Sequence, residues 1–164
     1  MSSAALDLFA GQDLTSGEVA PGQGWDVAFT VYGTPAPAGS KKAVPLKSGR
    51  WAVVDDSKRS RPWKEQVAQR AGEIMTGREL FRGPIEIVFR FFVRRPKSHF
   101  GARGLRPSAP RHPTIRPDVL KLARGVEDAL SGIVYADDSQ IVREQLVKEY
   151  GAPERVEVFV RALP

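Results

Sequence analysis

The sequence predicts an α+β fold in which a small mixed β-sheet is packed by two main helices. Two strongly patterned segments indicate this class. Residues 84–94 (PIEIVFRFFVR) alternate as a strand, with every second residue from Ile85 to Phe91 on one face. Residues 119–130 carry apolar residues at helical spacing, so that one arc from Val119 to Leu130 is apolar. Strands and helices do not alternate regularly along the chain, which favours α+β over a parallel doubly wound sheet.

The remaining elements are predicted from the same two patterns, alternation of apolar residues for strands and helical spacing of apolar residues for helices. Further strands are expected at residues 25–32, 51–54, 140–149 and 155–163, and the strand at 140–149 is chosen over a helix because its apolar residues are mostly branched. A helix is expected at residues 60–77, with Ser60 as N-cap, Pro62 in the first turn and Gly77 as the stop. Trp51 and Trp63 are expected in the core, with a role as base-stacking platforms as the less favoured alternative. Residues 33–50 and 95–117 are rich in Pro and Gly and are expected to form irregular loops.

The chain divides into a tail and one domain. Residues 1–24 are rich in Ser, Ala and Gly, and we expect them to form a flexible N-terminal tail; residues 25–164 form the folded domain. No apolar run approaches the roughly 18 residues of a membrane span, and the first residues do not resemble a secretory signal. The chain has no Cys, which excludes disulfides, thiolate catalysis and Cys-ligated zinc. A cytoplasmic protein is the simplest expectation.

Basic residues are concentrated in one part of the chain. The net charge is +6, and residues 90–116 hold eight Lys or Arg and no acid. Nucleic-acid phosphate is the commonest partner of such a block, although a solvated basic loop without a partner has the same composition. We predict that DNA contacts come from the cations of residues 41–64 and 90–116, with one in the helix that follows: Lys41, Lys42, Lys47, Arg94, Arg95, Lys97, Arg116 and Lys121.

Carboxylates surround the helix predicted at residues 119–130. Asp118 precedes it, Glu127 and Asp128 lie near its end, and Asp137-Asp138 follow it. Mg²⁺ prefers carboxylate oxygens and keeps several waters, so acids from two segments with a phosphodiester could form a hydrolytic site. Lys121, Arg124 and Lys148 are candidates to hold the phosphate.

Each acid also has a structural explanation. Asp118 suits a helix start, Asp128 could pair with Arg124, and Asp137-Asp138 could be a polar turn. No phosphate-binding loop of the GKS type is present, and His99 and His112 are expected to be bystanders in the basic loop.

The order of these pieces resembles the signature of RusA-like endodeoxyribonucleases. The segment RPDVLKLARGVEDALSGIVYADDSQIV contains Arg116-Pro117-Asp118, then Asp128-Ala129-Leu130, then Asp137-Asp138-Ser139-Gln140-Ile141, and Lys148 follows. Order and spacing are kept over about 30 residues. Weaker similarity extends to Phe29–Pro37 and Trp63, so the resemblance covers residues 25–164.

The resemblance implies a function. It implies a homodimer that binds four-way (Holliday) or otherwise branched DNA junctions in recombination and repair, and Mg²⁺-dependent nicking, with Mn²⁺ as a substitute. The family is common in bacteriophages, which implies the host cytoplasm for a phage-encoded member. The catalytic residues carried over by position are Asp118, Asp137, Asp138, Arg124 and Lys148, and the metal ligands are Asp118, Asp128, Asp137 and Asp138. An exposed edge of the strand at residue 84 or of the strand at residue 140 could supply the dimer interface.

One position departs from the family pattern. Many relatives have Asp two residues after the first Asp, where this chain has Leu120, which falls on the polar side of the helix and cannot bind a metal. Glu127 or Asp128 could replace the missing ligand, or metal binding could be weaker. The alternative function is a non-catalytic branched-DNA-binding protein of the same fold. A basic RNA-binding or ribosomal-type protein is a more distant third, supported by charge alone.

Overall fold

The computed structural model describes residues 24–39, 41–46, 48–55 and 60–164. The predicted tail therefore lies outside the described residues except for Gly24. The elements run in the order β1 (Val27–Tyr32), β2 (Lys41–Pro45), β3 (Trp51–Asp55), α1 (Ser60–Met75), β4 (Ile85–Val93), η2 (Lys97–His99), β5 (Phe100–Gly101), β6 (Gly104–Leu105), α2 (Val119–Leu130), η3 (Asp138–Gln140), β7 (Ile141–Tyr150) and β8 (Arg155–Ala162).

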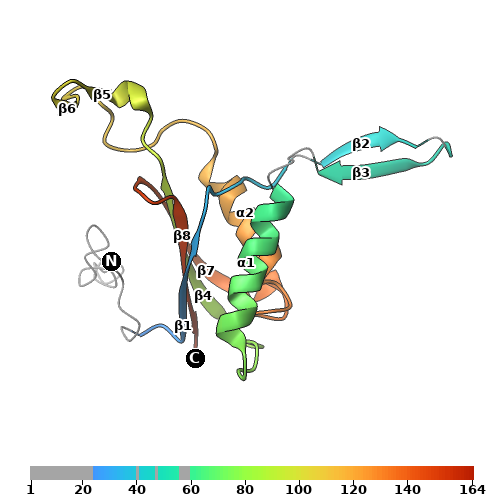
Figure 1. The fold of residues 1–164 in the computed structure, drawn as a ribbon. Coiled ribbons are helices and arrows are strands. Elements are labelled where there is room, and N and C mark those ends of the chain that lie inside the picture. The colour runs from blue at the N-terminus through green and yellow to red at the C-terminus, as the bar shows by residue number, and fades with distance from the viewer. Residues whose placement is uncertain (1–23, 40, 47, 56–59) are drawn as a thin grey trace, which may run out of the picture.

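A four-stranded mixed sheet organises the fold, and the predicted α+β class is confirmed. Its strand order is β1-β8-β4-β7. The β1–β8 and β8–β4 pairs are antiparallel, and the β4–β7 pair is parallel. Helices α1 and α2 cover the same face of this sheet (Figure 1).

The core lies between the helices and the sheet. Trp63, Val67 and Ala71 of α1 and Leu122 and Val126 of α2 are buried in it, against the helix-facing residues of β4, β8 and β1. The helical spacing of these side chains explains why both segments are helices, and both predictions are confirmed. Beyond α1, Gly77 has a φ of 75°, a left-handed conformation that Gly adopts without a steric penalty.

Strand β4 is buried on both faces. The sequence predicts one apolar face, and Ile85, Ile87, Phe89 and Phe91 do pack in the core. The residues between them are also buried, including Glu86 and Arg90. These charges are paired across strands: Arg161 donates to Glu86 at 2.8 Å, and Arg90 lies 3.3 Å from Glu149 and 3.4 Å from Glu157. Such pairs offset the desolvation of charges in the middle of a sheet.

The two predicted loops contain short hairpins. Strands β2 and β3 pair antiparallel as a separate two-stranded sheet, so Lys41 and Lys42 lie in a strand and the prediction of an irregular loop there is wrong. Strands β5 and β6 form a second small hairpin within residues 95–117. The prediction for Trp63 is confirmed, because this side chain is buried. Trp51, which was also expected in the core, is 69% exposed.

The sheet has two edges, formed by β1 and β7. The strand at residue 140 is therefore an edge strand, as a dimer interface through it would require. The strand at residue 84 is not, since β4 is paired on both sides. In the described part of the chain, no helix has the length and apolar character needed to cross a bilayer.

Candidate functional site

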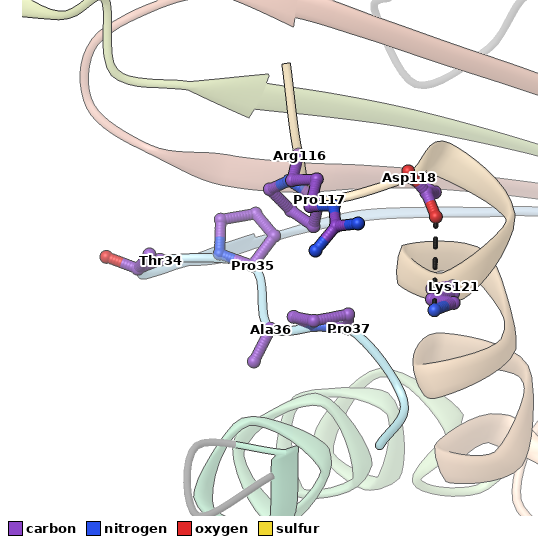
Figure 2. Close-up of a pocket in the computed structure, with 8 residues that line it drawn as sticks. All are labelled: Thr34, Pro35, Ala36, Pro37, Arg116, Pro117, Asp118 and Lys121. Atoms are coloured by element: carbon purple, nitrogen blue, oxygen red, sulfur yellow. Dashed lines mark ion pairs between the residues drawn. The ribbon is translucent and has the colours of Figure 1, made fainter. Parts of the chain in front are cut away.

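Asp118 forms part of a pocket at the start of α2. It is the N-cap of the helix, but its side chain makes no capping hydrogen bond there. The carboxylate is instead largely exposed, 4.0 Å from the Lys121 ammonium. The pocket has a volume of about 510 Å³ and combines proline rings with two cations; its lining is Thr34, Pro35, Ala36, Pro37, Arg116, Pro117, Asp118 and Lys121 (Figure 2).

The proline-rich segment is held against α2 by close backbone contact. The Ala38 amide donates to the Lys121 carbonyl at 2.7 Å. Gly125, buried in the middle of α2, has no side chain to hold the segment off. A Cβ at this position would lie 3.3 Å from the Ala36 oxygen and 3.4 Å from the Ala38 nitrogen. Gly125 therefore fixes one wall of the pocket, a role that sequence reasoning missed, although a Gly in a helix interior signals close packing.

Lys148 positions the chain in front of Asp118. Its Nζ donates to the carbonyls of Ile115 at 2.9 Å and Pro117 at 2.8 Å. Two of the three ammonium donors are thus used on backbone oxygens. The sequence predicts Lys148 as a catalytic residue that holds phosphate, whereas in the structure it holds the loop that carries Arg116 and Asp118.

A group of acids lies at the other end of α2. The carboxyl groups of Glu127 in α2 and Glu144 in β7 share a hydrogen bond. Burial raises the pKa of Glu127 to about 8, assisted by this hydrogen bond and by the charges of Glu144, Asp138 and Asp128. Glu127 therefore holds a proton at neutral pH. No sequence signal marks Glu144, because its position depends on how α2 packs against β7.

Asp128 links the two helices. Its Oδ2 accepts from Lys64 Nζ of α1 at 2.6 Å, and both side chains are partly exposed. The sequence suggests Arg124 as its partner at i, i+4, whereas the structure pairs it with Lys64. Arg124 is exposed on α2, between the two ends of the helix.

The Asp137-Asp138 turn is built by Gln140. Asp137 is the N-cap of η3, and its Oδ1 accepts from the Ser139 amide at 2.9 Å. The hydrogen bonds from Ser139 hold the pKa of Asp137 below its usual value. Gln140 Oε1 accepts from the amides of Ala136 and Asp137, and its Nε2 donates to the carbonyls of Phe81 and Gly83. The carboxylate of Asp137 thus caps a turn, while Asp138 is left exposed.

Asp118 and Asp138 lie at opposite ends of α2. The helix has 12 residues, and at 1.5 Å per residue it separates its ends by about 18 Å. The course of β7 also separates the two acids. Lys148 contacts Pro117, which precedes Asp118, whereas Ile141, seven residues earlier in β7, directly follows the turn that contains Asp138. Among the described residues, no three His, Asp or Glu side chains are grouped closely enough to hold a metal ion. The structure therefore brings Asp138 near Glu127 and Asp128, but not near Asp118.

The predicted DNA-binding residues lie mostly at the Asp118 end. Strands β1 and β4 both finish there, and the chain continues into the β2–β3 hairpin and towards the β5–β6 hairpin (Figure 1). Arg94, Lys97, Arg116 and Lys121 are exposed, and Lys41 and Lys42 lie in β2. Arg95 is partly used for structure: its guanidinium stacks on Tyr150 at 4.0 Å and donates to the Pro110 carbonyl. Lys47 lies outside the described residues.

Comparison with known proteins identifies the family. A sequence model described as "Endodeoxyribonuclease RusA" matches residues 33–161. The chain belongs to the RusA family. It is also 32% identical over 138 residues to an uncharacterized protein, YqaN, of Bacillus subtilis (strain 168), covering 82% of this chain and 95% of that protein. The RusA match includes the pocket, both ends of α2 and the hairpins, so the whole candidate site lies within the family's common region.

Proposed function

We propose that this RusA-family chain is a Mg²⁺-dependent, structure-selective endodeoxyribonuclease that nicks four-way or otherwise branched DNA junctions in recombination and repair. The observation that carries the proposal is the family match over residues 33–161, which includes carboxylates at both ends of α2 and a pocket with cations on its rim. Branch geometry rather than base sequence marks such a substrate, so phosphate contacts should dominate its recognition.

The donors at the two ends of α2 suit a hard divalent cation. Asp118 and Asp138 are exposed carboxylates, and Asp128 and Asp138 both lie close enough to Glu127, at the same helix end, to act on its charge. Since no three of the described acids enclose an ion, oxygens of the DNA phosphate and water would complete its coordination shell, as is usual for Mg²⁺. When bound, Mg²⁺ or Mn²⁺ would lower the pKa of a water and stabilise charge on the phosphate.

Side chains of the chain would hold the scissile strand. Arg116 and Lys121 on the rim of the pocket can bind phosphate oxygens, with Arg116 offering a bidentate fork. Lys148 acts through the carbonyls of Ile115 and Pro117, and so fixes where Arg116 and Asp118 stand. Arg124 lies on the exposed side of the helix that joins the two acidic ends, where a phosphate between those ends would meet it.

The length of α2 bears on the oligomeric state. Asp118 and Asp138 of one subunit are too far apart to share an ion, because roughly 18 Å of helix separates them. If both ligate the same metal, they come from different subunits of a homodimer. A two-fold dimer also supplies the two sites that paired nicks need.

A second candidate function is branched-DNA binding without cleavage. The observation that favours it is Leu120, which is 68% exposed where many relatives have Asp. An exposed Leu beside Asp118 adds no oxygen ligand, so metal affinity should be lower than with a second carboxylate.

A junction-cleavage assay separates the two functions. Wild type, Leu120→Asp and Asp138→Asn are compared on a synthetic four-way junction with Mg²⁺. We expect wild type to nick the junction, Leu120→Asp to nick it faster, and Asp138→Asn to lose at least about 100-fold in rate, which is typical when a group that stabilises developing charge is removed. Metal-independent binding of the junction by wild type without any product would contradict the nuclease and support the binding protein.

A further inference from the structure

The β2–β3 hairpin is an arm that stands apart from the core. It forms a two-stranded sheet of its own, with Pro45 opposite Trp51 and Lys41 opposite Asp55. Its turn is closed by the Leu46 amide, which donates to the Arg50 carbonyl at 2.7 Å, and Gly49 supplies a φ of 77°. The hairpin projects outward at the same end of the sheet as the start of α2 (Figure 1).

Trp51 is exposed at the distal end of this arm. Its side chain is 69% accessible, and its cross-strand partner Pro45 is exposed as well. A two-stranded hairpin is marginally stable alone, and packing an indole against other side chains is a usual way to stabilise one. Trp51 is not used in that way, so an apolar surface is left available to a partner.

The exposure of Trp51 belongs to a wider pattern. Single exposed apolar side chains are normal on any protein. Here, however, the large hydrophobic side chains exposed in the described chain lie, with the exception of Val142 in β7, at the end of β1, on the two hairpins, or around the start of α2: Tyr32, Leu46, Trp51, Phe100, Leu105, Ile115 and Leu120. The two hairpins project to opposite sides (Figure 1), so Trp51 is well separated from the β5–β6 hairpin. Arg116 and Lys121 also lie around the start of α2.

The charge of the arm indicates what kind of partner it meets. Residues 41–55 contain four cations, Lys41, Lys42, Lys47 and Arg50, and one acid, Asp55, which lies at the end of the hairpin opposite Lys41 and away from the turn. Cations interleaved with an exposed aromatic ring are typical of surfaces that bind unpaired nucleic acid, where the cations neutralise phosphates and the ring stacks on a base. Inside a duplex every base face is already stacked. Only a branch point or a single strand therefore offers a face to Trp51.

We propose that the β2–β3 hairpin enters the branch point of the DNA and that Trp51 stacks there on a base released from its pair. This inference rests on the proposed function for the identity of the substrate and adds the means by which a branch is distinguished from a plain duplex. Arg50, next to Trp51, binds a flanking phosphate, and this contact is the same on branched and linear DNA.

The test compares affinities for a four-way junction and for a linear duplex of the same sequence, in the Asp138→Asn background so that the DNA stays intact. Stacking on one base contributes about 1–3 kcal/mol. We therefore expect Trp51→Ala to weaken junction binding by about 5-fold to about 150-fold and to leave duplex binding within about 2-fold. Trp51→Phe should retain most of the junction affinity, and 2-aminopurine at the branch point should be less quenched by Trp51→Ala than by the parent.

Gln69→Ala provides the control. Gln69 is an exposed side chain in the middle of α1, outside the arm and outside both edge strands of the sheet, so its replacement should change neither affinity. Equal loss on junction and duplex, or no loss with Trp51→Ala, would overturn the inference. Far-UV circular dichroism and thermal melting confirm that each variant is folded.

The two proposals fail in different ways. No nicking by wild type with Mg²⁺ contradicts the nuclease, while the binding comparison still reports on Trp51. Nicking by wild type together with equal junction affinity of Trp51→Ala and its parent contradicts the stacking arm alone.

Discussion

At the scale of single residues, Glu127 shows most clearly how surroundings change chemistry. An exposed glutamate is charged at neutral pH, but here burial and the neighbouring carboxyl of Glu144 raise the pKa of Glu127 to about 8. The proton that the two carboxyl groups share removes the repulsion between them. The Tyr135 hydroxyl donates to the Glu127 carbonyl at 3.1 Å, and burial also raises the pKa of Tyr135, so this donor keeps its proton.

The first prediction concerns pH and stability. In the folded chain Glu127 binds a proton up to about pH 8, whereas in the unfolded chain it loses that proton near the ordinary value of 4.5. The folded state binds more protons between these values, so the free energy of unfolding falls as pH rises through this window. We expect the melting temperature, measured in EDTA, to fall by a few degrees between about pH 5 and about pH 9.

The matched variants separate this effect from general pH dependence. Glu127→Gln should flatten the melting profile, because its amide cannot titrate. Glu65→Gln, which removes an exposed acid of α1, should leave the slope unchanged. A profile for Glu127→Gln as steep as that of wild type would show that another group is responsible.

The second prediction concerns Lys148. Removing its ammonium leaves the carbonyls of Ile115 and Pro117 without their donor, so the loop in front of Asp118 should move. Small misplacements of reacting groups cost up to about 100-fold in rate. We expect Lys148→Met to lower the nicking rate by about 10-fold to about 100-fold with little change in junction affinity, as measured in single-turnover assays with saturating enzyme.

Arg70→Met is the control for Lys148, since Arg70 is a partly exposed cation of α1, paired in the described chain only with Glu73 of the same helix and outside both edge strands of the sheet. It should keep the wild-type rate. Lys148→Arg should recover part of the lost rate. A loss of junction affinity without a loss of rate in Lys148→Met would instead favour a direct phosphate contact.

At the scale of elements, α2 both stabilises the core and positions the acids of the candidate site. Its apolar side packs in the core, and its two ends carry the acids of the candidate site. Gly125 lets the segment from Ala36 to Ala38 approach the helix closely, which costs helix propensity but closes the pocket. The helix α1 contains a Gly of a different kind: a Cβ at Gly72 would meet nothing within 4 Å.

The third prediction compares these two helical glycines. Gly72→Ala should stabilise the fold by about 1 kcal/mol, the usual gain in helix propensity. Gly125→Ala should be destabilising, because its Cβ would lie 3.3 Å from the Ala36 oxygen, on a segment that the hydrogen bond from Ala38 to Lys121 holds in place. Urea unfolding of the two variants measures the difference; equal stabilisation by both would show that the segment at residues 36–38 yields freely.

Elements with a strong internal period could be predicted from the sequence. The apolar arc from Val119 to Leu130 and the branched residues of 141–147 are local signals, and both segments form the expected structure. The strand at residues 51–54 is expected from the sequence, but its pairing in a hairpin could not be predicted, since β2 is short and begins with two Lys. The exposure of Trp51 depends on where that hairpin projects. The burial of Glu86 and Arg90 depends on partners in β7 and β8 that the pattern of β4 alone does not reveal.

At the scale of the whole molecule, the candidate site is divided between two places. The sequence brings Asp118 and Asp138 within 20 residues of each other, but the helix between them holds them apart. Sequence proximity places these acids in one motif but could not predict their separation, which follows only from α2 running antiparallel to β7. Because Asp118 and Asp138 are far apart within one chain, a metal ion bound by both would require two subunits, so the function depends on whether the chain dimerises.

The fourth prediction tests a shared site by mixing subunits. Asp118→Asn and Asp138→Asn are each expected to be inactive alone. If one ion is held by Asp118 of one subunit and Asp138 of the other, a mixed dimer has one intact site and should nick one strand of the junction. In a random mixture about half of the dimers are mixed, and each of these keeps one of its two sites. Denaturing gels should then show single nicks at up to about a quarter of the wild-type level. No recovery on mixing, with exchange of subunits confirmed by native mass spectrometry, would place each site within one chain.

The four hydrogen bonds of Gln140 have a consequence for evolution. They tie the turn at Ala136 and Asp137 to the chain at Phe81 and Gly83, and Asp137 caps the short helix that follows. Selection for a stable turn is therefore enough to preserve Asp137, Ser139 and Gln140, whatever happens to cleavage. Under the proposed function Asp138 is a metal ligand, so it is the member of the motif that can drift once hydrolysis is no longer required. Natural relatives that keep the Gln but have lost the second Asp should therefore be descendants that still fold and hold DNA after giving up catalysis.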